Sequence, residues 1–120
     1  MENVIRTGGA GGAAGLVQQG DVLFYAVDGL PGGLKPRSRS RPGLATFAEG
    51  EATGHHHSCA AEDVELYEDA AGVLWCRVLA PETVVTHQEH KPVTLRRGDY
   101  RINFVREYDP FAERVRVVVD

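Results

Sequence analysis

The sequence predicts an all-β domain, and three features of the 120-residue chain support this fold class. Short runs rich in β-branched and aromatic residues recur, and in several of them apolar and polar residues alternate. Glycine, proline and aspartate separate these runs, and no segment shows the period of an amphipathic helix. A hydrophobic content of 42% and a charged content of 25% are typical of one soluble globular domain. We therefore expect a small single-domain barrel, jelly roll or sandwich.

The N-terminal segment differs in composition from the rest of the chain. Glycine, alanine and glutamine dominate residues 7–20, which favours a flexible chain. We therefore assign residues 1–18 to an N-terminal extension and residues 19–120 to the β domain. Residues 9–14 match the Gly-x-Gly-x-x-Ala spacing of a dinucleotide-binding turn, but neither a helix nor a βαβ unit follows. The sequence thus predicts no nucleotide cofactor.

The first strand signals lie between residues 21 and 79. The run at 21–27 is β-branched and aromatic, and a glycine- and proline-rich segment ends it. Alternation at 64–67, a turn at 69–72 and an apolar run at 73–79 together predict a β-hairpin.

Further strand signals follow Pro81, which we expect to end the hairpin strand. Short runs predict strands at 83–87, 92–96, 100–105 and 114–117. The tripeptide Arg97-Gly98-Asp99 predicts a turn between the second and third of these runs.

Charge is unevenly distributed along the chain. The formal net charge is −4, yet Lys35, Arg37, Arg39 and Arg41 lie within residues 34–42. Arginines in an extended segment can bind phosphates. The acidic balance and the lack of interleaved aromatic residues nevertheless favour a solvated loop over a nucleic-acid site.

The chain has the features of a cytoplasmic protein. No run approaches the roughly 20 apolar residues of a membrane span, and the N-terminus lacks the pattern of a signal peptide. The two cysteines, Cys59 and Cys76, are too few for a disulfide framework. We therefore expect reduced thiols, a cytoplasmic location and no membrane partner.

All five histidines lie in two short clusters, His55-His56-His57 and His87-x-x-His90. Side chains alternate in an extended segment, so His55 and His57 share a face and His56 points away. Two neutral imidazoles at this spacing can bind one metal ion from the same side, and the second cluster can supply further ligands. The sequence predicts a divalent transition-metal site for zinc, iron, nickel or manganese, with these ligands: His55, His57, His87 and His90.

The histidine spacing resembles the metal motifs of cupins, which are small double-stranded β-helix barrels. His55-x-His57 followed by Glu62 resembles their leading motif, and His87 lies at the place of their later histidine ligand. The proline-glycine-histidine order of the later motif is absent, because Gly98 stands well after His87. The resemblance implies a barrel that holds iron, manganese, nickel or zinc, with or without enzymatic activity.

A second resemblance covers about residues 18–120. Four segments resemble a pattern of small uncharacterised proteins from bacteria and their phages, namely Gln19-Gly-Asp-Val-Leu23, Gly50-Glu-Ala-Thr-Gly-His-His-His57, His87-x-Glu-His90 and Arg106-Glu-Tyr-Asp-Pro110. This resemblance implies no reaction. It singles out the following residues: Gly54, His55, His57, His87, Glu89, His90, Arg106 and Tyr108.

Two functions of different classes agree with these patterns. One is a metal-dependent hydrolase or oxygenase of an unidentified small molecule, with Glu89, His90 and Tyr108 as catalytic candidates. Tyr108 equally suits a structural role at a strand end. The other function is a non-enzymatic module of a mobile element that binds a protein partner or forms a homo-oligomer through the valine-rich segment 114–120. A metal centre predicts converging imidazoles, whereas the assembly module predicts a ring or shell.

Overall fold

The chain folds almost entirely into β-strands. The computed structural model describes residues 15–38, 41–50 and 52–105. Within these ranges one short 3₁₀ turn, η1 (Ala61–Asp63), interrupts the strands. The strands are β1 (Leu16–Gln19), β2 (Val22–Val27), β3 (Lys35–Pro36), β4 (Leu44–Glu49), β5 (His56–Ala60), β6 (Val64–Glu68), β7 (Leu74–Val85) and β8 (Val93–Phe104). The predicted all-β class is confirmed.

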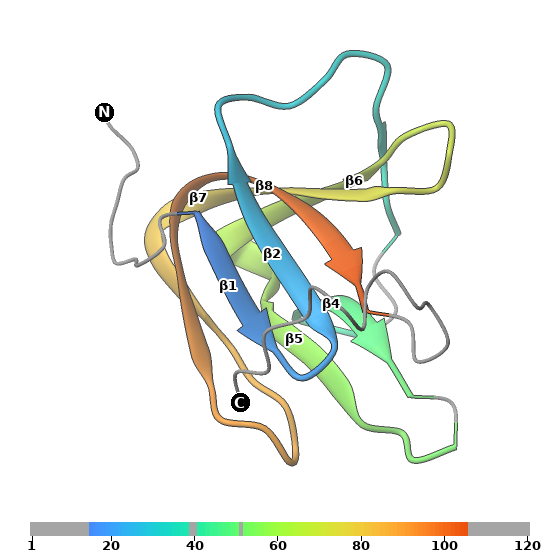
Figure 1. The fold of residues 1–120 in the computed structure, drawn as a ribbon, viewed down its shortest axis with the longest axis vertical. Coiled ribbons are helices and arrows are strands. Elements are labelled where there is room, and N and C mark those ends of the chain that lie inside the picture. Colours follow the sequence, from blue (N-terminus) through green and yellow to red (C-terminus); the bar gives the residue numbers. More distant parts are fainter. Residues whose placement is uncertain (1–14, 39–40, 51, 106–120) are drawn as a thin grey trace.

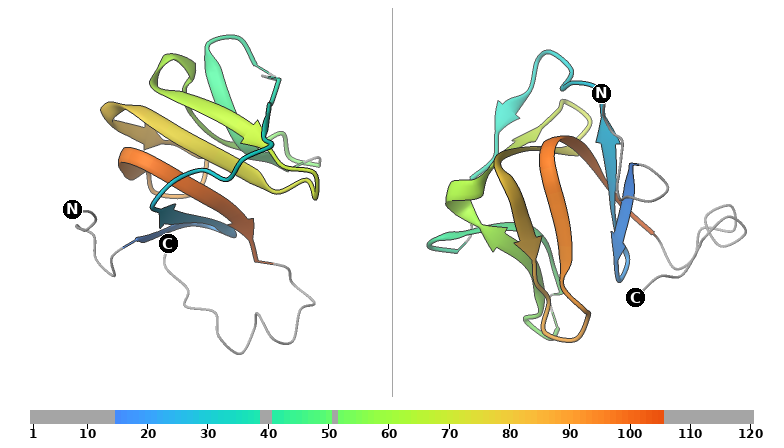
Figure 2. Two further views of the ribbon diagram at one scale, coloured as in Figure 1. Left: turned by 90° about the horizontal axis from the view of Figure 1, so that it is seen from above. Right: turned by 90° about the vertical axis from the view of Figure 1, so that its left-hand side faces the viewer.

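The strands form two antiparallel sheets. The larger sheet has the order β1-β2-β8-β7-β6-β3, and the smaller one pairs β4 with β5. The long strands β7 and β8 bend, so the larger sheet curls, and the β4–β5 pair lies across its inner face (Figures 1 and 2). An isolated bridge between Ser58 and Thr86 connects β5 to the end of β7.

The hydrophobic core lies between the curled sheet and the β4–β5 pair. Phe24 of β2 meets Phe47 of β4 edge to face, with the ring centroids 5.1 Å apart. Burial of each such side chain stabilises the fold by about 1.5–3 kcal/mol. The other members of the core are Val22, Ala45, Cys59, Val64, Leu66, Leu74, Cys76, Val78, Val85, Leu95, Tyr100 and Ile102.

Two predicted breaks in the strands are wrong. β7 continues through Pro81, and β8 continues through Gly98 where a turn at 97–99 was expected. The register changes there, because Val78 pairs with Gly98 whereas Glu82 pairs with Arg96. This irregularity accommodates a proline without a backbone N–H, and Gly98 adopts a φ of 145°. A shift in strand register therefore replaces the predicted turn.

The larger sheet begins earlier in the chain than its composition suggested. Leu16 to Gln18 belong to β1, although their composition favoured the N-terminal extension. β1 pairs with β2 through the two-residue turn Gly20-Asp21, with Gln19 opposite Val22. This hairpin brings polar side chains to one end of the sheet.

The first residues of the basic segment 34–42 lie along β6. Lys35 and Pro36 form β3, which pairs with Tyr67 and Glu68 of β6. Arg41 forms an ion pair with Glu49 at 2.6 Å. Residues 39–40, the predicted strand at 114–117 and the segment 114–120 lie outside the described residues. No helix in the described ranges has the length and apolar character needed to cross a membrane.

Candidate functional site

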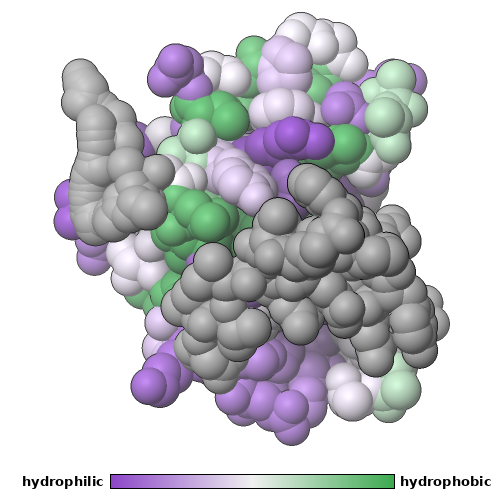
Figure 3. Space-filling view, viewed as in Figure 1, coloured by the Kyte–Doolittle hydropathy of each residue, from purple (hydrophilic) through white to green (hydrophobic). Residues whose placement is uncertain are grey.

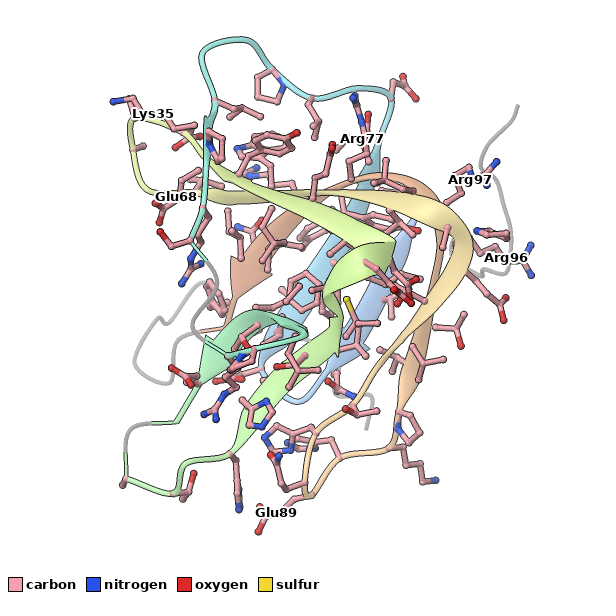
Figure 4. The ribbon with its side chains drawn as sticks, turned by 180° about the vertical axis from the view of Figure 1, so that it is seen from behind. Lys35, Glu68, Arg77, Glu89, Arg96 and Arg97 are labelled. Atoms are coloured by element: carbon pink, nitrogen blue, oxygen red, sulfur yellow. The ribbon has the colours of Figure 1, made fainter. Side chains whose placement is uncertain are left out.

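Three connections between strands meet at one end of the molecule. They are the β1–β2 turn, the β4–β5 connection and the β7–β8 connection, all at the lower end of Figure 1. Figure 4 shows Glu89 of the β7–β8 connection at this end, whereas Lys35 and Arg77 lie at the opposite end. Both histidine clusters belong to these connections or to the start of β5, so the fold brings them together.

Four imidazole rings form the centre of this end, and we call His55, His57, His87 and His90 the histidine cluster. The rings of His57 and His87 are closest, with 4.3 Å between their centroids. The centroids of His87 and His90 are 4.7 Å apart, and those of His55 and His87 are 5.4 Å apart. The rings of His57 and His90 stack at 6.0 Å. Two segments well separated in the sequence therefore meet.

Gln19 holds His57 in one orientation. Its side chain is 1% exposed, and its amide nitrogen donates to the carbonyl oxygens of Val85 at 3.0 Å and Lys91 at 2.8 Å. Both amide protons are thereby used, so the amide oxygen must accept the proton of His57 Nδ1 at 2.8 Å. In the neutral ring Nε2 then carries a lone pair.

The buried position of His57 favours its neutral form. Burial, reinforced by the nearby His87, lowers the pKa of His57 from 6.5 to about 4, although the Asp21 carboxylate opposes this shift. Burial and the neighbouring His90 also lower the pKa of His87. At neutral pH the two closest rings of the histidine cluster are therefore uncharged, and His57 Nε2 is available as a ligand or acceptor.

His87 has the opposite proton arrangement to His57. The backbone N–H of Glu89 donates to His87 Nδ1 at 3.0 Å, which places the proton of the neutral ring on Nε2. Among the described residues, no three histidine, cysteine, aspartate or glutamate side chains already stand in an arrangement that would hold a metal ion. Ligation through Nε2 would require the His87 proton to move from Nε2 to Nδ1, with loss of the hydrogen bond from the Glu89 N–H.

The β1–β2 turn forms a further wall of the site. Asp21 Oδ1 lies 4.0 Å from His57 Nε2. Gly20 has a φ of +58°, and a Cβ atom added there would lie 2.6 Å from His90 Nε2. Only glycine therefore allows this turn to approach His90 so closely.

An open cleft gives access to the histidine cluster. Its volume is about 910 Å³, and all four rings of the cluster line it together with Gly20, Asp21 and Glu89. A cleft of this size can admit a small molecule. Figure 3 shows hydrophilic residues gathered at the lower end of the molecule. The site is therefore a polar, solvent-accessible pocket beside neutral imidazoles.

The remaining residues singled out from the sequence take other positions. His56 turns away from the cluster, and its Nδ1 lies 2.7 Å from the buried Ser58 hydroxyl. Glu89 is exposed, with its carboxylate 3.7 Å from His55 Nδ1. Glu62 is exposed in η1 and does not line the cleft. Arg106 and the catalytic candidate Tyr108 lie outside the described residues.

The buried cysteines lack the features of nucleophiles. Burial raises the pKa of the Cys59 thiol to about 11 and raises the pKa of the Cys76 thiol as well. Both thiols are therefore protonated at neutral pH. They serve as small apolar core residues, as expected for reduced cysteines.

Gln19, Gly20 and Asp21 are parts of the site that the sequence did not predict. Gln19 and Gly20 resemble in composition the preceding glycine-rich segment, which obscured a short strand at Leu16–Gln19. The available signal was the dipeptide Gly20-Asp21 at the start of the β-branched run at 21–27, because such dipeptides form two-residue hairpin turns. A hairpin assignment would have placed Gln19 beside the following strand.

The comparisons with known proteins place the chain in a family. A family model described as a domain of unknown function, DUF8820, matches residues 18–104. The chain belongs to this family. No curated protein and no solved structure matches it. The matched residues of the DUF8820 domain contain the whole histidine cluster and the β1–β2 turn, but the family description assigns them no activity. The cupin, bacterial and phage resemblances stay predictions.

We expect Gly20→Ala to destabilise the DUF8820 domain by about 1–2 kcal/mol and to displace His90, because a Cβ atom strains this backbone conformation and contacts the ring. Urea unfolding measures the first effect, and the NMR shifts of the His90 ring protons measure the second. Gly33→Ala is the matched control, since Gly33 also has a positive φ but nothing lies within 4 Å of its added Cβ. Equal shifts of the His90 ring in both variants would contradict the predicted contact.

Proposed function

We propose that this domain binds a divalent transition-metal ion through the histidine cluster, with His57 as its first ligand. The observation that carries the proposal is the convergence of four imidazoles beside a His57 ring whose Nδ1 proton is held by Gln19. Histidine ligands of metal ions commonly donate their other ring N–H to an oxygen acceptor in this way.

The protonation state of His57 favours a ligand over a general base. A general base is most effective with a pKa near the working pH, whereas the pKa of His57 is about 4. A metal ligand instead benefits from a low pKa, because no proton has to leave before the metal binds. The neutral tautomer with a free Nε2 is therefore suited to coordination.

The rearrangement that metal binding requires is small in energy. His87 must exchange its hydrogen bond from the Glu89 N–H, which contributes about 1 kcal/mol. Apparent binding free energies for structural zinc reach roughly 10–16 kcal/mol. Coordination can thus easily drive the His87 ring into a ligating orientation.

The donor set favours some of the candidate metals over others. Imidazole suits zinc, nickel and iron, whereas manganese prefers oxygen ligands. The proposed ligands are His57 and one or both of His87 and His90, with His55 adjacent to His87. A coordination position open to the cleft would support hydrolytic or oxygen-dependent chemistry on a small molecule. Glu89, near His55, is the candidate acid or base.

We expect tag-free protein, purified without added metal, to contain close to one zinc, nickel or iron ion per chain. Mass spectrometry of the metal content of the purified protein measures the number of metal ions per chain. His57→Ala and His87→Ala should each lower it severalfold, because each removes a proposed ligand. His56→Ala is the matched control, since His56 belongs to the same triplet but hydrogen-bonds Ser58 instead.

Two results would contradict the proposal. One is wild-type protein that is folded, free of metal and no more heat-stable after addition of zinc, nickel or iron. The other is a loss of metal in His56→Ala as large as that in His57→Ala and His87→Ala, because the loss would then not depend on the proposed ligands.

A further inference from the structure

Asp21 occupies a position that the pattern of histidines does not predict. It is the second residue of the β1–β2 turn, and its side chain is 70% exposed. Its Oδ1 nevertheless lies 4.0 Å from Nε2 of the buried His57. A backbone hydrogen bond holds the turn in place, because the N–H of Val105 donates to the Asp21 carbonyl oxygen at 2.9 Å.

The two facing atoms are both acceptors. Gln19 takes the Nδ1 proton of His57, so Nε2 of the neutral ring carries a lone pair. The carboxylate oxygen of Asp21 is an acceptor as well. Two acceptors 4.0 Å apart repel each other unless a cation or a proton donor lies between them.

The separation of the two atoms is close to that of ligands on one metal. Zinc bonds to imidazole nitrogen and carboxylate oxygen are about 2.0–2.2 Å long, so two such ligands at tetrahedral angles lie about 3.4 Å apart. A change of about 0.6 Å from the present distance is therefore needed. Rotation of an exposed aspartate side chain can supply it.

We infer that Asp21 is the carboxylate ligand of the metal ion bound by His57. This inference rests on the proposed metal-binding function and names a ligand that the histidine clusters do not supply. His87 or His90 then provides the second imidazole, since their rings lie nearest to His57. Two histidines and one carboxylate leave coordination positions open, which is the ligand set of many non-haem iron sites. Such a centre suits oxygen-dependent or hydrolytic chemistry at the cleft.

Cobalt(II) titration of the full chain tests this assignment. The visible absorption bands of bound cobalt report its ligands and geometry, and competition with a chelator gives its Kd. We expect Asp21→Asn to weaken cobalt binding by at least about 100-fold and to change the absorption bands, because a ligand is lost. Asp28→Asn is the matched control. Asp28 follows the other end of β2 and its loss removes the same charge.

The outcomes separate the two proposals. Unchanged affinity and absorption bands in Asp21→Asn would overturn the assignment of Asp21 and leave histidine binding intact. Equal weakening in both variants would overturn it too, because overall charge would then explain the effect. Failure of the wild-type chain to bind cobalt would overturn the metal-binding function itself. Thermal unfolding in chelator checks that Asp21→Asn remains as stable as the wild type.

Discussion

Replacement of Gln19 by leucine is expected to destabilise the domain by about 3–5 kcal/mol, because three polar groups, of which the Val85 carbonyl oxygen and His57 Nδ1 are buried, lose their partner at once. The carbonyl oxygens of Val85 and Lys91 lose the amide donor, and Nδ1 of His57 loses its acceptor. Gln19 is 1% exposed, so water cannot readily replace these hydrogen bonds. Metal affinity should fall as well, because the tautomer of His57 is no longer determined by the fold.

Urea unfolding in chelator measures the loss of stability, and nitrogen NMR shifts report the tautomer of His57. Gln18→Leu is the matched control, because Gln18 is also buried but its amide donates to one carbonyl oxygen among the described residues, that of Gly20. It should cost about 1 kcal/mol. Gln19→Glu separates the roles, since glutamate can accept from His57 but cannot donate to Val85 or Lys91 in its ionised form. Equal losses for Gln18→Leu and Gln19→Leu would refute the bridging role.

The metal-free protein is expected to lose about 3 kcal/mol of unfolding free energy through His57 as the pH falls from 7 to 4. The pKa of His57 is about 4 in the folded state, against 6.5 for the unperturbed ring of the unfolded chain. Above pH 6.5 the ring is neutral in both states, so stability does not depend on it. Below that pH the unfolded chain takes up a proton that the folded chain excludes, and stability falls until the folded ring also protonates. The lowered pKa of His87 acts in the same direction.

Denaturant unfolding of chelator-treated protein at several pH values tests this dependence. His57→Asn is the matched variant, because the asparagine amide can still donate to Gln19 without titrating. The difference between wild type and His57→Asn isolates the contribution of His57 from that of the carboxylates. Parallel pH profiles for the two proteins would show that His57 does not carry the effect.

Local patterns predicted the hairpin of β6 and β7 but not the register shift that follows it. The turn at 69–72 lies between two strand-forming runs, so the hairpin can be predicted from the residues that form it. Pro81 and Gly98 gave misleading signals, because both residues usually end strands. Here they lie at an irregular register between β7 and β8, where a missing N–H and a positive φ are tolerated. Pairing with the neighbouring strand decides whether such a residue ends a strand or lies within it. The sequence of one strand does not contain this information.

The histidines of the site were predictable, whereas their partners were not. Residue type and spacing made His55, His57, His87 and His90 candidates, and the structure brings their rings together. Gln19 and Asp21 carry no comparable signature. Aspartate is common at turns, and glutamine is common at exposed positions. The role of Gln19 arises only from its contact with a ring 38 residues away.

The sequence by itself determined the all-β class and the presence of two histidine clusters, because alternation, turn residues and residue type are local properties. Only the tertiary structure decided which nitrogen of His57 is free and which carboxylate faces it. These details depend on the β1–β2 hairpin and on the bridge between β5 and β7. The physical reason is that hydrogen-bond direction and burial, which set the tautomer and the pKa of His57, exist only once distant strands have paired.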